Sequence, residues 1–373
     1  MKVPFFVPWI NKQDKDAINK ALTQRWLTNG PLSQKFEEKF QKFLKLKYSL
    51  TTSSATHALH LSLRSIGIKQ GDEVIVPTFT FTATADVVSY CNAKPILADT
   101  DPETFNISAK SIRKKISKKT KAIILVHYGG QACNIKEIAE LAKRSNLSII
   151  EDCAHALGSK YQNRFCGSFG AAGCFSFYPT KIITTGEGGM LTTNDKEIFN
   201  KSKSLRSHSM TKLPIQRESE ADWKYDVVDL GFNYRLDEIR SALGLSQLAR
   251  INLINKYRMN IAKKYDEGLG KINGITIPKK LPDRNHIFHL YTIKIHKNFH
   301  LSRDEVFQKL HKAGIGTSVQ YLPLHLMTCN KRKYNYNDFP NANKIKDEIL
   351  SLPIFPKMTN NQIQYVVNTL KKI

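Results

Sequence analysis

Between about residues 50 and 195, short apolar runs alternate with segments that have apolar residues at every third or fourth position. The runs are rich in β-branched residues and lack clean alternation, which is typical of strands buried on both faces of a mostly parallel sheet. The segments between them, such as 134–146, predict amphipathic helices. This pattern indicates an α/β domain in which helices flank the sheet. The predicted strands are 72–77, 94–101, 121–130, 147–155, 173–179 and 188–195.

The pattern changes near residue 250. Residues 235–269 predict one long helix, straight or bent, that leads into a second region. In that region 288–295 predicts a strand, and the capping-box spacing of 302–305 opens a predicted helix that runs to about residue 312. Two more helices are predicted over 345–352 and 360–372. We therefore expect a large domain over residues 1–250, N-terminal arm included, and a small α+β domain over 251–373.

Composition excludes several classes of protein. The chain has 373 residues, of which 41% are hydrophobic and 24% charged, as in a globular protein large enough for two domains. No apolar run is long enough to span a bilayer, and the first 16 residues lack a signal-peptide cleavage pattern. The six cysteines form no CxxC pair and lie mostly among small or apolar neighbours. We therefore expect a reduced, cytoplasmic protein without a zinc site.

The formal net charge of +25 raises the question of a nucleic-acid partner. The positive residues are mostly lysines scattered along the chain, and no aromatic RNA-binding strand or zinc-finger spacing accompanies them. We interpret the excess as a solvated lysine-rich surface, which would also attract a small substrate that carries phosphate. Neither nucleic acid nor a membrane is an expected partner.

Candidate chemistry centres on FSFYPTKIITTGEGGM (175–190), in which Lys181 lies between an apolar run and a glycine turn. Burial favours the neutral, nucleophilic form of a lysine, so Lys181 is a candidate covalent catalyst. In EDCAHALGS (151–159), Asp152 follows an apolar run and is suited to face a positive group, such as a protonated pyridine nitrogen. No second acidic or histidine cluster has the spacing of a metal site.

Three other segments carry weaker signals. TTSSATHALH (51–60) leads small hydroxyl residues into a helix, either as a simple N-cap or as a phosphate-binding helix start. PTFTFTAT (77–84) places two phenylalanines after a strand, where an aromatic ring packs in the core or stacks on a planar cofactor. LGFNYRLDE (230–238) puts Asn233 and Arg235 before the long helix. Neither a GxxxxGK[ST] loop nor a GxGxxG turn is present, which argues against a nucleotide-cleaving or dinucleotide enzyme.

Together and in this order, these segments resemble the sugar aminotransferases of the DegT/DnrJ/EryC1/StrS family, which are fold-type-I pyridoxal-phosphate enzymes. The resemblance covers nearly the whole chain, from WLTNGPLSQKFEEKF (26–40) through HYGGQ (127–131) and YLPLH (321–325) to LSLPIFP (350–356). It implies an aspartate-aminotransferase-like α/β fold, with a mostly parallel sheet flanked by helices and a smaller C-terminal α+β domain.

The resemblance also implies roles for individual residues. Lys181 is the lysine bonded to the cofactor and the base that moves the proton, and Asp152 pairs with the pyridine nitrogen. Asn233 reaches the phosphate in the neighbouring subunit, so the active unit is a homodimer with shared active sites. The other implied contacts are His155, Ser176, Ala55, Thr56 and Phe81 with the cofactor, and Thr28, Tyr321 and His325 with the substrate.

The expected reaction is a two-step transamination for the synthesis of surface polysaccharides or glycoconjugates. Glutamate supplies the amino group, and a nucleotide-linked ketosugar receives it. His155 and Glu187 match members that act on 4-ketosugars, so a UDP- or dTDP-linked 4-keto-6-deoxyhexose is the predicted substrate, with a 3-ketosugar as the alternative. Ala55 and Ser209 stand where the family usually has glycine, and the second change bears on the identity of the substrate.

Two other functions remain to be weighed. A sugar dehydratase of the same fold would carry histidine in place of Lys181, which argues against that chemistry. A non-enzymatic regulator or nucleic-acid-binding protein would use the basic surface, but such a protein has no need of Lys181, Asp152 and Asn233 together.

Overall fold

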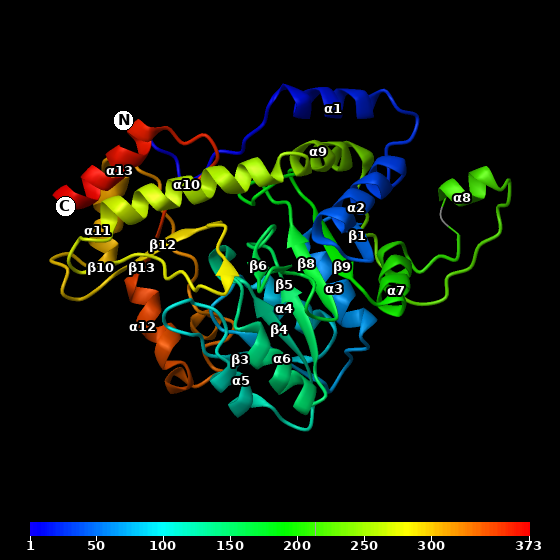
Figure 1. Ribbon diagram of the computed structural model, residues 1–373. Helices are drawn as coiled ribbons and strands as arrows, with labels where there is room; N and C mark the ends of the chain where they lie inside the picture. Colours follow the sequence, from blue (N-terminus) through cyan, green and yellow to red (C-terminus); the bar gives the residue numbers. More distant parts are fainter. Residues whose placement is uncertain (213) are drawn as a thin grey trace.

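The computed structural model describes residues 1–212 and 214–373 and has a seven-stranded sheet at its centre (Figure 1). In their order across the sheet, the strands are β1 (Tyr48–Thr52), β9 (Gly189–Thr193), β8 (Ala172–Ser176), β5 (Ser148–Asp152), β4 (Thr120–Val126), β2 (Glu73–Pro77) and β3 (Lys94–Ala98). Pairing is parallel from β8 to β3, whereas β9 runs antiparallel to both β8 and β1. The prediction of a mostly parallel sheet is therefore confirmed.

Helices cover both faces of this sheet. They are α2 (Pro31–Leu44), α3 (Ala55–Ser65), α4 (Ala83–Tyr90), α5 (Ala109–Lys115), α6 (Ile135–Arg144) and α7 (Lys196–Arg206). In β4, Ala122 and Ile124 pack in one apolar cluster with α3 and α4, whereas Ile123 and Leu125 pack in another with α2 and α6. Because both faces are buried, the strand needs apolar residues at successive positions, which explains the lack of alternation in its sequence.

The segment predicted as one long helix over 235–269 forms two helices that follow one another closely (Figure 1). They are α9 (Glu238–Leu248) and α10 (Ile251–Leu269). The side chain of Asp237 accepts a hydrogen bond from the first turn of α9 and fixes its beginning. The backbone of Arg250 departs from helical values, and its guanidinium bonds the buried carboxylate of Asp14 in α1 (Lys12–Leu22). The helix therefore breaks where the N-terminal segment is attached.

A smaller antiparallel sheet lies in the C-terminal part of the chain. It consists of β10 (Ile275–Thr276), β12 (Tyr291–Ile295) and β13 (Ile349–Leu352), and it shares an apolar cluster with α11 (Arg303–Lys312) and α13 (Asn360–Lys372). The predicted capping box of α11 is confirmed, because Ser302 and Glu305 bond each other's backbone amides. The predicted helix over 345–352 is wrong in its second half. After α12 (Pro340–Glu348), residues 349–352 are buried and pair with β12, so the sheet decides their conformation.

Shorter elements complete the described chain. A third sheet orders β11 (Arg284–Asn285), β6 (Lys160–Tyr161) and β7 (Arg164–Phe165), and it joins the C-terminal part of the chain to the loop after β5. The 3-10 helices are η1 (Tyr128–Gly130), η2 (Leu324–Leu326) and η3 (Tyr336–Asp338). Among the described residues, no helix is both long and apolar enough to cross a membrane.

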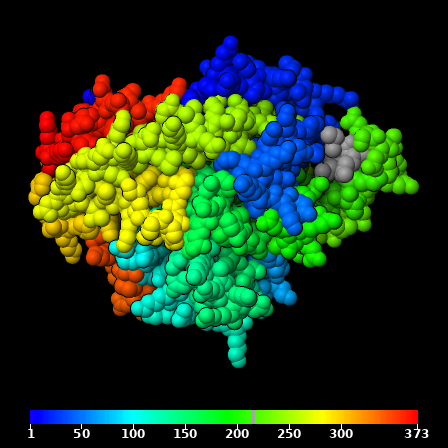
Figure 2. Space-filling view, viewed as in Figure 1, coloured from blue at the N-terminus to red at the C-terminus, as the bar shows by residue number. Residues whose placement is uncertain are grey.

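Residues 217–231, which we call the projecting segment, stand away from the body of the protein beyond α7 (Figures 1 and 2). The segment begins within the short helix α8 (Pro214–Ser219). Several of its large apolar side chains are exposed, with Trp223 at 79% and Leu230 at 74%. Grouped apolar exposure of this kind marks an interaction surface.

The six cysteines, all of which the structure describes, form no disulfide, and five of them are buried. Burial raises the pKa of these five thiols, to about 11 for Cys91. A thiol that stays protonated is a poor nucleophile, so these side chains act as small apolar groups. Cys329 is the exposed member of the set.

Candidate active site

Three strands of the large sheet end at the same edge, and the residues that follow them lie together. η1 follows β4, Asp152 ends β5 with His155 just beyond it, and Lys181 follows β8. The backbone N–H of Gly129 donates to Nδ1 of His155 (3.3 Å). Asp152 and Lys181 lie close enough for each charge to act on the pKa of the other. The carboxyl edge of a parallel sheet, where α/β proteins bind ligands, thus carries the predicted chemistry.

Hydrogen bonds close the base of the loop that carries Lys181. The amide of Phe177 donates to the carbonyl of Gly188 (2.9 Å), and the amide of Thr185 donates to the carbonyl of Phe177 (3.0 Å). The hydroxyl of Thr184 donates to the same carbonyl (3.0 Å). The threonines and glycines that follow the lysine therefore fix the loop on the end of β8.

Lys181 is half-buried, and none of the described residues hydrogen-bonds its amino group. Burial lowers the pKa of Lys181 to about 8, although the negative charge of Asp152 acts in the opposite direction. A lysine with this pKa exchanges protons readily near neutral pH and has a substantial fraction of nucleophilic free amine.

Asp152 is buried at the end of β5. One carboxylate oxygen accepts the amide of Ala154 (3.0 Å), and the other accepts the hydroxyl of Thr84 (3.1 Å). Burial raises the pKa of Asp152, while the Ala154 amide and the charge of Lys181 favour its ionised form. A buried carboxylate with acceptor capacity left over is suited to a cationic ligand group.

His155 is buried beside these two groups and hydrogen-bonds through both ring nitrogens. Because Nδ1 accepts from Gly129, the ring proton lies on Nε2, which is 3.0 Å from the hydroxyl of Tyr321. Burial lowers the pKa of His155, and the charge of Lys181 acts in the same direction, so the ring is neutral. The hydroxyl of Tyr128 donates to the carbonyl of Gln320, which fastens the Tyr321 loop to the same edge.

The predicted phosphate-binding helix start is formed by α3. Ser54 is its N-cap and accepts the amide of the third helical residue (3.1 Å). Within the described residues, the amides of Ala55 and Thr56 have no acceptor. A side-chain carbon at Gly189 would lie 2.6 Å from the Ala55 nitrogen, so only glycine lets β9 pass this close. Free amides at the positive end of a helix suit a phosphate group.

The two phenylalanines after β2 have different surroundings. Phe79 is buried against Phe105 and Tyr128, whereas Phe81 is 58% exposed and its ring centroid lies 6.2 Å from that of Tyr321. Phe81 is therefore the ring with a face available to a ligand. Ser176, at the end of β8, is half-buried, and its hydroxyl accepts the amide of Tyr178 (3.4 Å).

Asn233, Thr28 and His325 are predicted site residues without a hydrogen bond to Lys181, Asp152 or His155 in the described chain. Asn233 is exposed and lies next to the projecting segment, and Thr28 is exposed before α2. His325 is buried with both ring nitrogens in use, by Thr78 (2.7 Å) and Asn343 (2.8 Å). A direct contact between His325 and substrate would have to replace one of these bonds.

His289 is a residue of this region that the sequence analysis did not single out. Its ring centroid lies 4.3 Å from that of His155, and it is 4% exposed. The only sequence signal is a histidine at the start of the predicted strand 288–295. Its neighbours come from distant parts of the chain, so no local pattern could have identified it.

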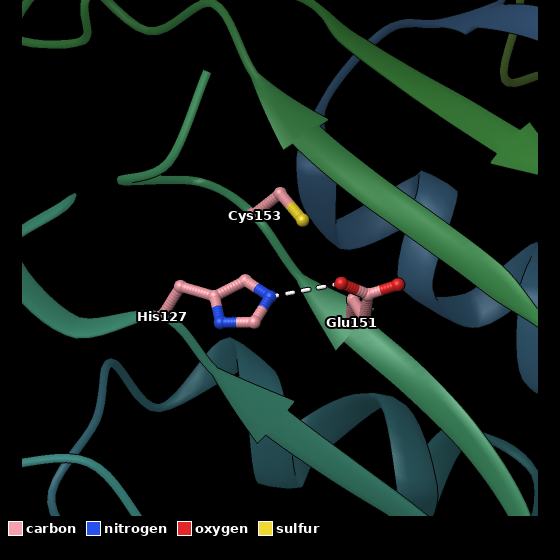
Figure 3. Close-up of side chains that lie close together, drawn as sticks. All are labelled: His127, Glu151 and Cys153. Atoms are coloured by element: carbon pink, nitrogen blue, oxygen red, sulfur yellow. Dashed lines mark hydrogen bonds and ion pairs between the residues drawn. The ribbon is translucent and has the colours of Figure 1, made fainter. Parts of the chain in front are cut away.

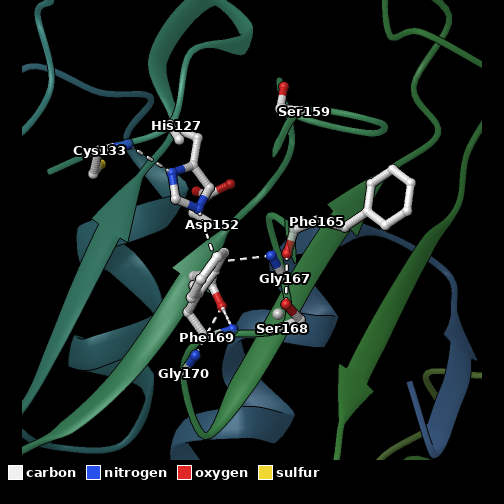
Figure 4. A network of polar contacts seen from close by, with 12 residues as sticks. His127, Cys133, Asp152, Ser159, Phe165, Gly167, Ser168, Phe169 and Gly170 are labelled. Atoms are coloured by element: carbon white, nitrogen blue, oxygen red, sulfur yellow. Dashed lines mark hydrogen bonds and ion pairs between the residues drawn. The ribbon is translucent and has the colours of Figure 1, made fainter. Parts of the chain in front are cut away.

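His127, Glu151 and Cys153 form a buried group near the carboxyl edge of the large sheet (Figure 3). The sequence analysis found no histidine spaced to join Glu151, but the structure brings His127 from the neighbouring strand to 2.9 Å. The Glu151 carboxylate also accepts amides of the turn before β8, whose residues 167–170 are labelled in Figure 4. These amides are Gly167 (2.7 Å), Phe169 (2.6 Å) and Gly170 (2.8 Å). Both oxygens of Glu151 are thus occupied by N–H donors, and the group fastens the turn instead of offering ligand atoms to a metal.

Residues 8–371 match the model of the DegT/DnrJ/EryC1/StrS aminotransferase family. The chain belongs to this family. It is 36% identical to the spore coat polysaccharide biosynthesis protein SpsC of Bacillus subtilis, with 100% of this chain and 97% of SpsC covered. It is also 36% identical to the GDP-perosamine synthase of Escherichia coli O157:H7, with 99% of this chain and 98% of that protein covered.

Solved structures of this aminotransferase family have the same fold. PseC of Helicobacter pylori, an aminotransferase of pseudoaminic acid biosynthesis, has a TM-score of 0.93 and 32% identity over 100% of this chain and 99% of its own. A putative sugar aminotransferase of Streptococcus pneumoniae in its PMP form has a TM-score of 0.93 and 29% identity, over 100% of this chain and 98% of its own. The same protein is also known in a PLP form. The cofactor of this aminotransferase is therefore pyridoxal phosphate.

Proposed function

We propose that this aminotransferase moves an amino group from glutamate to a nucleotide-linked ketosugar, in the synthesis of a surface polysaccharide or glycoconjugate. The observation that carries the proposal is Lys181, half-buried with a pKa of about 8 beside the buried Asp152. Relatives that cover the full chain support the substrate class, since they include a GDP-perosamine synthase and a polysaccharide biosynthesis protein.

The described residues fit pyridoxal phosphate. The free amides of Ala55 and Thr56, with the Ser176 hydroxyl, would hold the phosphate, and Phe81 would stack on the ring. Asp152 would pair with the pyridine nitrogen, and His155 would lie against the cofactor as a neutral imidazole. When bound, the cofactor supplies an electron sink that stabilises negative charge on carbon.

Lys181 would bind the cofactor covalently and act as the acid–base group of the reaction. Its lowered pKa lets the amino group take a proton from the amino donor and return it to the sugar carbon that receives the nitrogen. The face from which Lys181 delivers that proton would set the stereochemistry of the new C–N bond.

We propose a homodimer in which Asn233 reaches the cofactor phosphate of the partner subunit. Asn233 is exposed and unattached to its own Lys181 site, and the adjacent projecting segment exposes Trp223 and Leu230. A second copy of the chain is the partner that would cover these apolar side chains. Thr28, exposed before α2, is also available to a ligand at such an interface.

On the substrate side, we propose that Tyr321 contacts the sugar and that His325 holds its loop. Tyr321 hydrogen-bonds His155, whereas both nitrogens of His325 are used in packing. His155 and Glu187 match the pattern of members that act on 4-ketosugars, so the amine would be placed on C4 of a UDP- or dTDP-linked 4-keto-6-deoxyhexose.

The test is to incubate the protein with glutamate and a panel of UDP-, dTDP- and GDP-linked 4-keto and 3-keto sugars. Mass spectrometry identifies aminated products, and NMR locates the amine on the ring. A 4-amino product is expected. Amination of 3-keto sugars alone would overturn the C4 position of the amine but keep the aminotransferase. If no sugar of the panel is aminated and glutamate yields no 2-oxoglutarate, the proposed substrate class is wrong.

A further inference from the structure

His289 packs against His155 at the edge of the large sheet. The ring planes are inclined by 36° with centroids 4.3 Å apart. The main chain at His289 is held from behind by the buried Arg258 of α10. The guanidinium of Arg258 donates to the carbonyls of Phe288 (3.2 Å), His289 (3.2 Å) and Ile354 (3.0 Å). The position of His289 is therefore fixed by the backbone and by ring packing.

Gly130 allows the two histidine segments to approach each other. Its φ is +96°, a conformation that side-chain-bearing residues rarely adopt. A side-chain carbon there would lie 3.0 Å from the backbone nitrogen of His289 and 3.1 Å from the carbonyl oxygen of His155. Gly130 of the HYGGQ segment thus lets the main chains of His155 and His289 pack closely beside the active site.

The two imidazoles differ in their hydrogen bonds. His155 uses both nitrogens, with Gly129 and Tyr321. In the described chain no residue hydrogen-bonds the ring of His289, and its Nδ1 is fully enclosed. Enclosing a polar nitrogen without a partner costs about 1–3 kcal/mol. A phenylalanine would fill the same space without this cost, so folding alone does not explain a histidine here.

The positive groups of Lys181 and Arg258 lie near the ring of His289. Burial lowers the pKa of His289 well below the ordinary value, and the positive charges of Lys181 and Arg258 act in the same direction. His289 is therefore a neutral imidazole with one N–H donor and one free acceptor, close to the reactive lysine. A neutral N–H donor in a low-dielectric site is suited to bind an oxygen of a ligand.

We propose that His289 is a ligand-binding residue of this active site, whose Nε2, the ring nitrogen that is not fully enclosed, hydrogen-bonds an oxygen of the cofactor or substrate held beside Lys181 and His155. The inference rests on the proposed function, since it requires that a ligand occupies this edge. The imidazole at position 289 serves binding at the expense of stability.

The test compares His289→Phe with wild type. In the cofactor-free protein, the thermal midpoint of His289→Phe should equal or exceed that of wild type. Binding should weaken roughly 3- to 10-fold, the effect of one lost hydrogen bond. A raised dissociation constant for pyridoxal phosphate, measured by fluorescence titration, assigns the oxygen to the cofactor. An unchanged constant with a raised KM assigns it to glutamate or the sugar.

His325→Phe is the matched control for stability, because His325 is equally buried but has partners on both nitrogens. It should lower the thermal midpoint, because Thr78 and Asn343 lose their partners. His289→Asn and His289→Gln each place an amide nitrogen near one of the imidazole nitrogens, and at least one should restore the binding lost in His289→Phe.

Two results would overturn the inference. One is a His289→Phe protein with unchanged cofactor affinity, KM and turnover. The other is a loss of stability in His289→Phe as large as in His325→Phe. Borohydride labelling of Lys181 separates this failure from that of the proposed function. If Lys181 is labelled and His289→Phe behaves as wild type, only the inference fails; if Lys181 is not labelled in wild type, the proposed function fails as well.

Discussion

Glu151 and Asp152 are adjacent in β5 and both buried, yet their surroundings are opposite in kind. Glu151 accepts four N–H groups, one from His127 and three from the turn before β8. Asp152 accepts one amide and one hydroxyl and faces Lys181. Neighbouring residues of a strand point to opposite faces, so a single step along the chain separates a structural carboxylate from a chemical one.

The comparison teaches how to distinguish the two roles. Both residues are buried carboxyl groups, so burial and residue type do not identify function. What differs is whether the protein itself satisfies the acceptors. Glu151 has none to spare, whereas Asp152 and Lys181 have unused capacity toward the same edge. The predictions below would break or sharpen this distinction.

The largest effect is expected for Lys181→Ala. Turnover should fall by about 10⁴-fold or more, because under the proposed function the covalent attachment and the acid–base group are lost together. Borohydride reduction of the wild-type protein should fix the cofactor on the peptide that holds Lys181. The exposed Lys203 of α7 is the matched control, and Lys203→Ala should retain wild-type turnover. Labelling of another lysine would show that the central assignment is wrong.

The next effect separates the two carboxylates directly. Glu151→Ala should lower the free energy of unfolding by about 3–5 kcal/mol, because His127 and three amides lose their buried acceptor. Asp152→Ala should change the stability of the cofactor-free protein by no more than about 1 kcal/mol, since it removes a buried charge with few partners. Urea unfolding of both variants measures the difference. Equal losses of stability would contradict the division between a structural and a chemical carboxylate.

A smaller effect is expected from the free-energy cost of burying the charged amino group of Lys181. Its pKa in the folded protein is about 8, below the ordinary 10.5, so between these values the unfolded chain binds more protons. The penalty is fully present below pH 8 and fades as the pH rises toward 10.5. At pH 7, cofactor-free Lys181→Met should therefore be more stable than wild type by about 1–3 kcal/mol. The gap should close by pH 10.5; a gap that does not change with pH would argue against the lowered pKa.

The smallest effect is expected for Asn233, which lies next to the projecting segment. Asn233→Ala should weaken cofactor binding about tenfold, as expected for one hydrogen bond to a charged group, with little change in thermal midpoint. Mixing Lys181→Ala with Asn233→Ala protein should restore activity, because one site of each hybrid dimer then has both groups. If subunits exchange and Asn233→Ala is impaired, yet mixing restores nothing, the sites are not shared.

Much of the large sheet could be predicted because its strands are buried on both faces and read as apolar runs. The placement of Lys181, Asp152 and Ser176 after such runs also follows from the sequence, since parallel strands end at one edge. The sequence analysis assigned residues 349–352 to a helix because four mostly apolar residues are too few to distinguish the helical spacing of apolar positions from that of a strand. Pairing with β12, more than 50 positions away, decides their structure.

The rest of the site depends on contacts between distant segments. His289 and Tyr321 reach His155 from the C-terminal part of the chain, and nothing near them in sequence indicates that contact. His127 approaches Glu151 in the same way. The family resemblance could identify Tyr321 but not the hydrogen bonds of the residues around it. Only the structure shows that both ring nitrogens of His325 are already hydrogen-bonded.

The arrangement of the cysteines gives this protein a ready attachment point for a probe. Five thiols are enclosed and held protonated, which leaves Cys329 as the one a maleimide dye can reach. Cys329 borders a surface hollow with Glu73 and Lys94, at the beginnings of β2 and β3, whereas Lys181 lies past the opposite ends of the strands. Donor and acceptor dyes coupled there would report subunit exchange by energy transfer without engineering a cysteine or disturbing the active site.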